Sequence, residues 1–131
     1  MVDNIGRLVL VQHDLLAAAI TAFRLRLLGY DIVSVERGED VPAAVQDDVP
    51  DLVLVETNLP GINGFEVINR LRSQEKTAHV PILVSSPDST PESVRQAFLA
   101  GATDYLLMPF DPATLESKIE SLLETAAQAT A

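Results

Sequence analysis

Polar side chains that are able to do chemistry follow directly after the short apolar runs of this sequence. Gln12, His13 and Asp14 follow one run, and Glu56 follows another. Carboxylates and an imidazole can bind a cation, act as nucleophiles or titrate near neutral pH. The corresponding positions after two later runs are Ser86, which carries a hydroxyl, and Met108, which carries a thioether.

A metal site is the weaker interpretation of the histidine in this set. His13 stands beside Asp14 and across from Glu56, but one histidine with two carboxylates lacks the ligand spacing of a dedicated site. The other histidine, His79, is predicted to lie on a distant loop. The 131 residues contain no cysteine, which excludes a disulfide framework, a thiolate nucleophile and a cysteine-based zinc site. We therefore predict neither a bound metal nor a cofactor.

The elements that position these side chains follow from the alternation of apolar runs with amphipathic segments. This alternation predicts repeated β-α units around a parallel sheet whose two faces are both covered. Five units favour an open, doubly wound α/β fold with the flavodoxin-like strand order 2-1-3-4-5. The predicted strands are Leu8 to Val11, Ile32 to Val35, Leu52 to Val55, Ile82 to Val84 and Tyr105 to Leu107.

Apolar stripes at helical spacing predict the amphipathic helices between the strands. Gly29 and Gly101 follow two of these stripes as helix terminators. Thr90-Pro91 and Asp111-Pro112 each place a capping side chain before a proline suited to the first helical position. The stripes are Leu16, Ile20, Phe23 and Leu27; Val94 and Phe98; and Leu115, Ile119 and Leu122.

Length and charge predict one domain that binds neither nucleic acid nor membranes directly. We expect residues 1–131 to form a single domain with a core at about 7–124, and residues 125–131 to be a tail or the start of a linker. A net charge of −10 repels nucleic-acid backbones and anionic membrane surfaces. No apolar run approaches the roughly 20 residues of a membrane span, and Met1 to Gly6 lacks a signal pattern. A cytoplasmic location is expected.

Strand order also predicts where ligands or partners would reach the polar residues. In a doubly wound sheet, the binding crevice lies beyond the carboxyl ends of the strands where the strand order reverses. Here this point lies between the first and third strands, with Gln12, His13 and Asp14 on one side and Glu56 on the other. Because Ser86 and Met108 follow the fourth and fifth strands, the fold collects all six residues around one pocket.

Four segments together resemble the receiver domain of response regulators, from about Arg7 to the last helix. LVLVQHD at 8–14 resembles the first strand and acidic turn of that family, and LPGINGFE at 59–66 is similar to the loop after its phosphoacceptor. PILVSS at 81–86 looks like the segment that ends in the family's switch residue, and GATDYLLMPF at 101–110 looks like its closing motif. The resemblance implies a cis peptide bond between Met108 and Pro109.

At the reactive positions, the sequence departs from the pattern of that family. By the resemblance, Gln12 and His13 stand in place of two acids, Glu56 in place of the acceptor aspartate and Met108 in place of a lysine. Ser86 and Tyr105 take the two switch positions. Phosphoryl transfer to a carboxylate needs a hard divalent cation and compensating positive charge, which these replacements do not supply. We therefore do not expect phosphorylation at this site or any enzyme activity.

Glu56 has two interpretations. Its carboxylate can imitate a phosphorylated aspartate and hold Ser86 and Tyr105 in an activated arrangement, although a phosphoryl group carries about twice the charge and three acceptor oxygens. Alternatively, it is a residual polar group that pairs locally with His13. We favour the second interpretation.

These observations leave three candidate functions for the chain. The leading prediction is a phosphorylation-independent pseudo-receiver that binds a signalling protein or an output domain. The family's fourth helix, fifth strand and fifth helix suggest the binding face and a possible homodimer, with Arg95, Leu99, Tyr105 and Lys118 as candidates. The alternative is a working receiver that a histidine kinase phosphorylates. A flavodoxin-like FMN module is disfavoured, because 12–15 offer no phosphate loop after the first strand.

Overall fold

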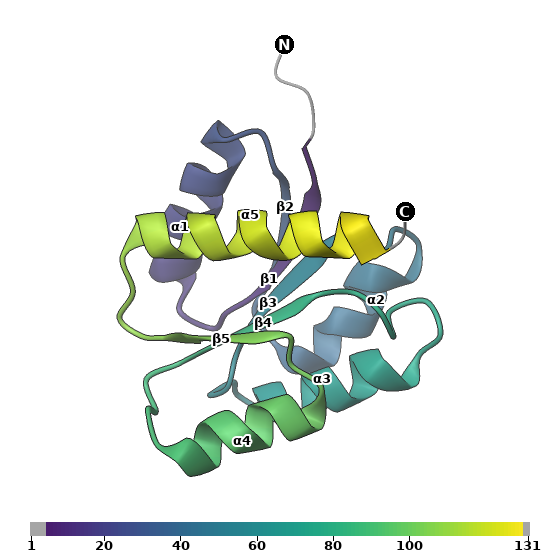
Figure 1. Cartoon of the computed structure of the whole chain (residues 1–131), viewed down its shortest axis with the longest axis vertical. Coiled ribbons are helices and arrows are strands. Elements are labelled where there is room, and N and C mark those ends of the chain that lie inside the picture. Colours follow the sequence, from purple (N-terminus) through teal and green to yellow (C-terminus); the bar gives the residue numbers. More distant parts are fainter. Residues whose placement is uncertain (1–4, 130–131) are drawn as a thin grey trace.

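The computed structural model describes residues 5–129 as a five-stranded parallel sheet with helices on both of its faces (Figure 1). The strand order is β2-β1-β3-β4-β5, which confirms the predicted doubly wound α/β fold and its order. All five predicted strands are present, and each boundary lies within two residues of the expected one. The strands are β1 (Arg7–Val11), β2 (Asp31–Val35), β3 (Leu52–Glu56), β4 (Ile82–Ser86) and β5 (Asp104–Leu107).

The helices alternate with the strands along the chain. They are α1 (Leu15–Leu27), α2 (Val41–Gln46) after a short 3-10 turn η1 (Gly38–Asp40), α3 (Gly64–Ser73), α4 (Pro91–Ala100) and α5 (Pro112–Ala129). No helix within residues 5–129 is long and apolar enough to cross a membrane.

Side-chain alternation along the strands divides the core into two layers. Valines and isoleucine of the strands, such as Val9 and Ile82, pack against α2, α3 and α4. Leucines of the same strands, such as Leu10 and Leu54, pack against α1 and α5 on the other face. Glu56 continues the leucine side of β3, so its side chain lies on the α1 and α5 face.

The structure buries a different side of α1 from the one that the apolar stripe predicted. Leu16, Ile20, Phe23 and Leu27 are all exposed, and the residues of α1 that face the sheet are Ala18, Ala22 and Leu25. The helix is apolar on both sides, so helical spacing alone did not decide which side is buried. Small alanines let a helix backbone lie close to a sheet, and a close approach favours this face.

Of the other two predicted stripes, one is confirmed and one is partly wrong. On α5, Leu115 and Ile119 are buried and Leu122 packs partly buried against the same core, as predicted. On α4, Phe98 is 45% exposed, and the small residues Ser93 and Ala97 face the core in its place.

The helix boundaries follow local capping chemistry, as the sequence indicated. The Thr90 side chain accepts a hydrogen bond from the Ser93 amide at the start of α4. Asp111 accepts one from the Ala113 amide at the start of α5. Gly29 and Gly101 have φ angles of 104° and 120°, a region that only glycine adopts easily, so both predicted terminators are confirmed.

The expected tail is partly helical. α5 continues through Ala129, beyond the predicted end of the core at about residue 124. The remainder of that expectation, residues 130 and 131, and the first four residues of the chain lie outside the described residues. The domain limits remain a prediction.

Candidate functional site

The carboxyl ends of β1, β3 and β4 bring the predicted pocket residues to one edge of the sheet. β1 pairs with β3 through Val11 and Val55, so the next residues, Gln12 and Glu56, lie side by side. Glu56 is in turn the register partner of Ser85 on β4. Met108 joins them because its amide donates a hydrogen bond of 2.8 Å to the Ser86 carbonyl.

Glu56 is a nearly buried carboxylate whose side chain contacts His13. Its side chain accepts a hydrogen bond of 3.2 Å from the His13 amide, and its second oxygen lies 3.8 Å from Nδ1 of the same residue. Burial raises the pKa of the Glu56 carboxyl, His13 opposes that shift and the nearby Asp14 adds to it. The local pairing of Glu56 with His13 that we expected is therefore present.

Asp14 is bonded to the first turn of the helix that follows it. Its Oδ1 accepts hydrogen bonds of 3.1 Å from the amides of both Leu16 and Ala17, so it is the N-cap of α1. One oxygen of this exposed side chain therefore serves helix capping.

Two further polar side chains of the site are buried without full hydrogen bonding. Gln12 is 4% exposed, and within residues 5–129 its Oε1 has no hydrogen-bond partner; the same is true of the Ser85 hydroxyl. A search of the same residues finds no group of three or more His, Cys, Asp or Glu side chains that could hold a metal ion. The arrangement offers a neutral amide, an imidazole and one buried carboxylate.

Ser86 is bonded within the strand-end loops. The Thr57 hydroxyl donates a hydrogen bond of 2.9 Å to the Ser86 hydroxyl, and the Asp88 amide donates one of 3.1 Å to the same oxygen. Among the described residues, no hydrogen bond joins Glu56 to Ser86 or to Tyr105. The bond between Thr57 and Ser86 had no sequence signal.

Tyr105 ties β5 to the loop before α4. Its hydroxyl donates a hydrogen bond of 2.6 Å to the Asp88 carbonyl and lies 3.2 Å from the Ser93 hydroxyl. The side chain is half-buried, and its ring packs against the valine side of the core. The peptide bond between Met108 and Pro109 is cis, as the resemblance implied.

The predicted partner face is formed by α4, β5 and α5, which carry the four candidates. Leu99 is 75% exposed, and Arg95 is exposed on the same helix. Lys118 instead makes an ion pair of 2.9 Å with Asp104, so part of its charge is used within the domain. His79 lies at the opposite end of the sheet, beside Val80 and Pro81, where it was expected.

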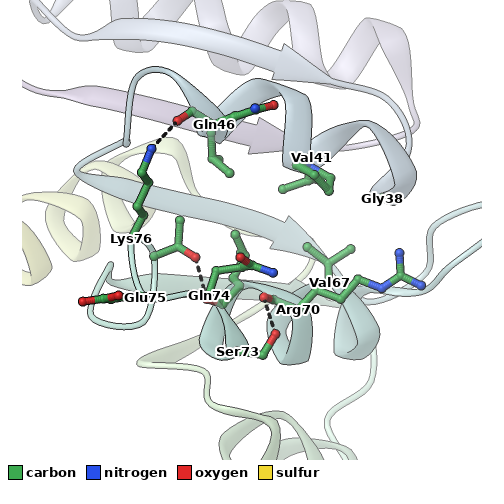
Figure 2. Close-up of a pocket in the computed structure, with 13 residues that line it drawn as sticks. Gly38, Val41, Gln46, Val67, Arg70, Ser73, Gln74, Glu75 and Lys76 are labelled. Atoms are coloured by element: carbon green, nitrogen blue, oxygen red, sulfur yellow. Dashed lines mark hydrogen bonds between the residues drawn. The ribbon is translucent and has the colours of Figure 1, made fainter.

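A cavity of about 480 Å³ lies between α2 and α3, away from the strand ends (Figure 2). Val41, Val45 and Leu71 are among the apolar side chains of its lining. In Figure 2, Lys76 reaches from the loop after α3 to α2, where its Nζ donates a hydrogen bond of 3.3 Å to the Gln46 carbonyl. The sequence did not indicate this cavity, because its apolar residues have the spacing of ordinary core positions.

Known proteins of one family are similar to this chain over almost its whole length. The sequence model of the response regulator receiver domain family matches residues 8–120. The chain is 31% identical to the DNA-binding dual master transcriptional regulator RpaA of Synechocystis sp., over 89% of this chain and 48% of that protein. It is 29% identical to the phosphate regulon transcriptional regulatory protein PhoB of Pseudomonas aeruginosa, over 91% of this chain and 52% of that one.

The chain thus spans about half the length of these two regulators. Its fold is similar to that of the chemotaxis response regulator CheY4 of Vibrio cholerae, with a TM-score of 0.86 at 24% identity over 91% of this chain and 99% of that one.

Proposed function

Because this chain belongs to the response regulator receiver domain family, we propose that it is a pseudo-receiver, which signals by binding another protein without being phosphorylated. Receiver domains are signalling modules of two-component systems. The observation that carries the proposal is the shortage of carboxylates at the strand ends that are free to bind a cation. The one nearly buried carboxylate there, Glu56, contacts His13, and the neighbouring Asp14 caps α1.

The residues at the strand ends do not fit magnesium, which the family implies. Magnesium prefers an octahedral shell of carboxylate, carbonyl and water oxygens. Gln12 supplies a neutral amide oxygen, and His13 supplies nitrogen ligands that suit softer metals. The carboxylate of Asp14 already accepts two amide hydrogen bonds. We therefore derive no phosphoryl transfer through a metal in this chain.

The remaining requirements of phosphoryl transfer are also missing. The thioether of Met108 has no donor for phosphoryl oxygens and no charge to stabilise them. The raised pKa of Glu56 means that burial disfavours its ionised form, which is the nucleophilic one. Both features support a pocket that no longer performs the reaction.

The contacts of Glu56 also support its interpretation as a residual polar group. An activating mimic would act on the switch residues, but the hydroxyls of Ser86 and Tyr105 bond to Thr57 and to the backbone of Asp88. We infer that a protein partner, another signalling protein or an output domain, reads the surface of α4, β5 and α5. Leu99 and Arg95 are the exposed contacts that we assign to it.

Intact-mass measurement after incubation with acetyl phosphate and magnesium tests the proposal. We expect no mass increase in the unmodified chain. The matched control restores the pattern of the family by Gln12→Asp, His13→Asp, Glu56→Asp and Met108→Lys in one chain, which should gain one base-labile phosphoryl group. A phosphoryl group on Glu56 or Asp14 of the unmodified chain would identify a working receiver, the substrate of a histidine kinase.

A further inference from the structure

The outer face of α1 carries four large apolar side chains in water. Leu16, Ile20, Phe23 and Leu27 are 72%, 54%, 63% and 68% exposed, and together they form what we call the α1 stripe. The face of the helix opposite to it, with Ala22 and Leu25, packs on the sheet. In Figure 1, α1 lies at one side of the molecule, next to α5.

The spacing of the α1 stripe is that of a helix-pairing seam. Its residues follow one another at intervals of four, three and four positions, the alternation that the a and d positions of two packed helices show. A surface helix that served only the core would place polar residues on this side. The alanines at 17 and 19 flank the seam with small side chains that let a second helix approach closely.

The apolar area is that of an interface. At about 200 Å² for a fully exposed large side chain, the α1 stripe presents roughly 500 Å² of surface. Leu15 and Leu28, which are 65% and 47% exposed, flank the stripe at the two ends of the helix and bring the exposed apolar surface here to roughly 700 Å². The largest apolar patch of a typical monomer is about 300–600 Å². A stable dimer buries about 800 Å² on each partner, so two such faces suit each other.

The charge distribution selects a second copy as the occupant. Two chains of net charge −10 repel each other, but residues 15–30 include no aspartate or glutamate. The two arginines of α1 are already engaged within the domain. Arg24 makes an ion pair of 2.9 Å with Glu116 on α5, and Arg26 donates a hydrogen bond of 3.1 Å to the Ile32 carbonyl. The α1 face therefore carries little negative charge to oppose the approach of a second copy.

We propose that this chain forms a symmetric homodimer by antiparallel packing of two α1 stripes. In this arrangement, Leu16 lies against Leu27 of the partner subunit, and Ile20 lies against Phe23 of the partner subunit. A parallel arrangement would set the arginines of the two copies beside each other, whereas the antiparallel one separates them. The interface differs from the face of α4, β5 and α5, and the proposal does not depend on phosphorylation.

Sedimentation velocity over a range of protein concentrations tests the dimer. The unmodified chain should convert from monomer to dimer as its concentration rises, and added salt should strengthen the dimer by screening the net charge. Phe23→Glu should weaken association about a hundredfold or more, because each dimer then buries two unpaired charges. Leu99→Lys is the control on the face of α4, β5 and α5, since Leu99 is 75% exposed there, and it should leave the α1 dimer intact.

Cysteine cross-linking tests the direction of the helices in a chain without native cysteine. Under oxidation, Leu16→Cys mixed with Leu27→Cys should give a heterodisulfide, and neither variant alone should form a disulfide dimer. The two positions 16 of an antiparallel pair are about 16 Å apart along the helix axis. A chain that stays monomeric at all concentrations would overturn the dimer, as would a dimer that survives Phe23→Glu but not Leu99→Lys. A homodisulfide of Leu16→Cys would overturn the antiparallel arrangement.

Discussion

Two regions depart from the usual distribution of side chains in opposite directions. One is the strand-end pocket, the group of polar residues that follow β1, β3 and β4, and the other is the α1 stripe. In the pocket, the polar residues Gln12 and Glu56 are 4% and 7% exposed, whereas in the α1 stripe Leu16 and Phe23 are 72% and 63% exposed. Neither arrangement is the most stable one for an isolated domain. Departures of this kind concentrate where a surface or a pocket serves function more than folding. The pocket buries polar groups, and the stripe exposes apolar area.

Substitutions on the two faces of α1 should give the largest contrast. Leu25→Ala removes a fully buried side chain and should lower the free energy of unfolding by about 2–5 kcal/mol. Leu27→Ala, two residues further on, should change it by less than about 0.5 kcal/mol in the monomer, because its side chain is already in water. Urea unfolding at low protein concentration measures both values. Equal losses would mean that the stripe supports the fold.

The pocket should respond in the opposite sense when a polar group is removed. Gln12→Met replaces a buried amide whose Oε1 lacks a partner among residues 5–129, with little change in volume. We expect the free energy of unfolding to rise by about 1–2 kcal/mol, since an unsatisfied buried acceptor costs roughly that much. Thermal and urea unfolding measure this change, with Gln12→Asn as the polar control. A destabilised Gln12→Met chain would show that the amide is needed.

Asp14 links the two regions, because it follows His13 and caps α1. Asp14→Ala should lower the free energy of unfolding by about 1 kcal/mol through loss of the two capping hydrogen bonds. Asp14→Asn keeps an oxygen acceptor and should retain most of that stability. If instead Asp14→Asn is as unstable as Asp14→Ala, the charge of Asp14 serves the pocket rather than the helix.

Magnesium should leave the melting temperature of the unmodified chain unchanged.

The smallest effect should appear in the pH dependence of stability. Because burial raises the pKa of Glu56 in the folded chain, the folded state holds its proton more tightly than the unfolded state. Stability should therefore fall as the pH rises from the ordinary value of 4.5 through the folded pKa. Glu56→Gln stays neutral and should lose this dependence. Urea unfolding at several pH values compares the two chains, and identical pH profiles would contradict the raised pKa.

The fold could be predicted from the sequence in considerable detail. Uniformly apolar runs as short as Leu52 to Val55 are typical of strands that are covered on both faces, and they favour a parallel sheet. Local chemistry decided the helix ends, because Thr90 and Asp111 cap the amides that follow them. These features depend on residues close together in the chain, which a sequence displays directly.

The contacts of the pocket could be predicted only in part. Strand order placed Gln12, Glu56 and Ser86 together, and the pairing of Glu56 with His13 was expected. The bonds that hold Ser86 and Tyr105 depend on the loops at Thr57 and Asp88, whose paths are set by packing. Asp14 had to be seen in place before its role as a cap was evident.

The sequence by itself determined the order of strands and helices, the alternation that makes two core layers and the residue types at the strand ends. Only the tertiary structure decided which side of α1 meets the sheet, because both sides have apolar residues at helical spacing. It also decided that Arg72 donates hydrogen bonds to the carbonyls of Val80 and Gly101, which lie 8 and 29 residues further along the chain. Periodicity fixes which residues share a face, whereas burial depends on the shape of what packs against it.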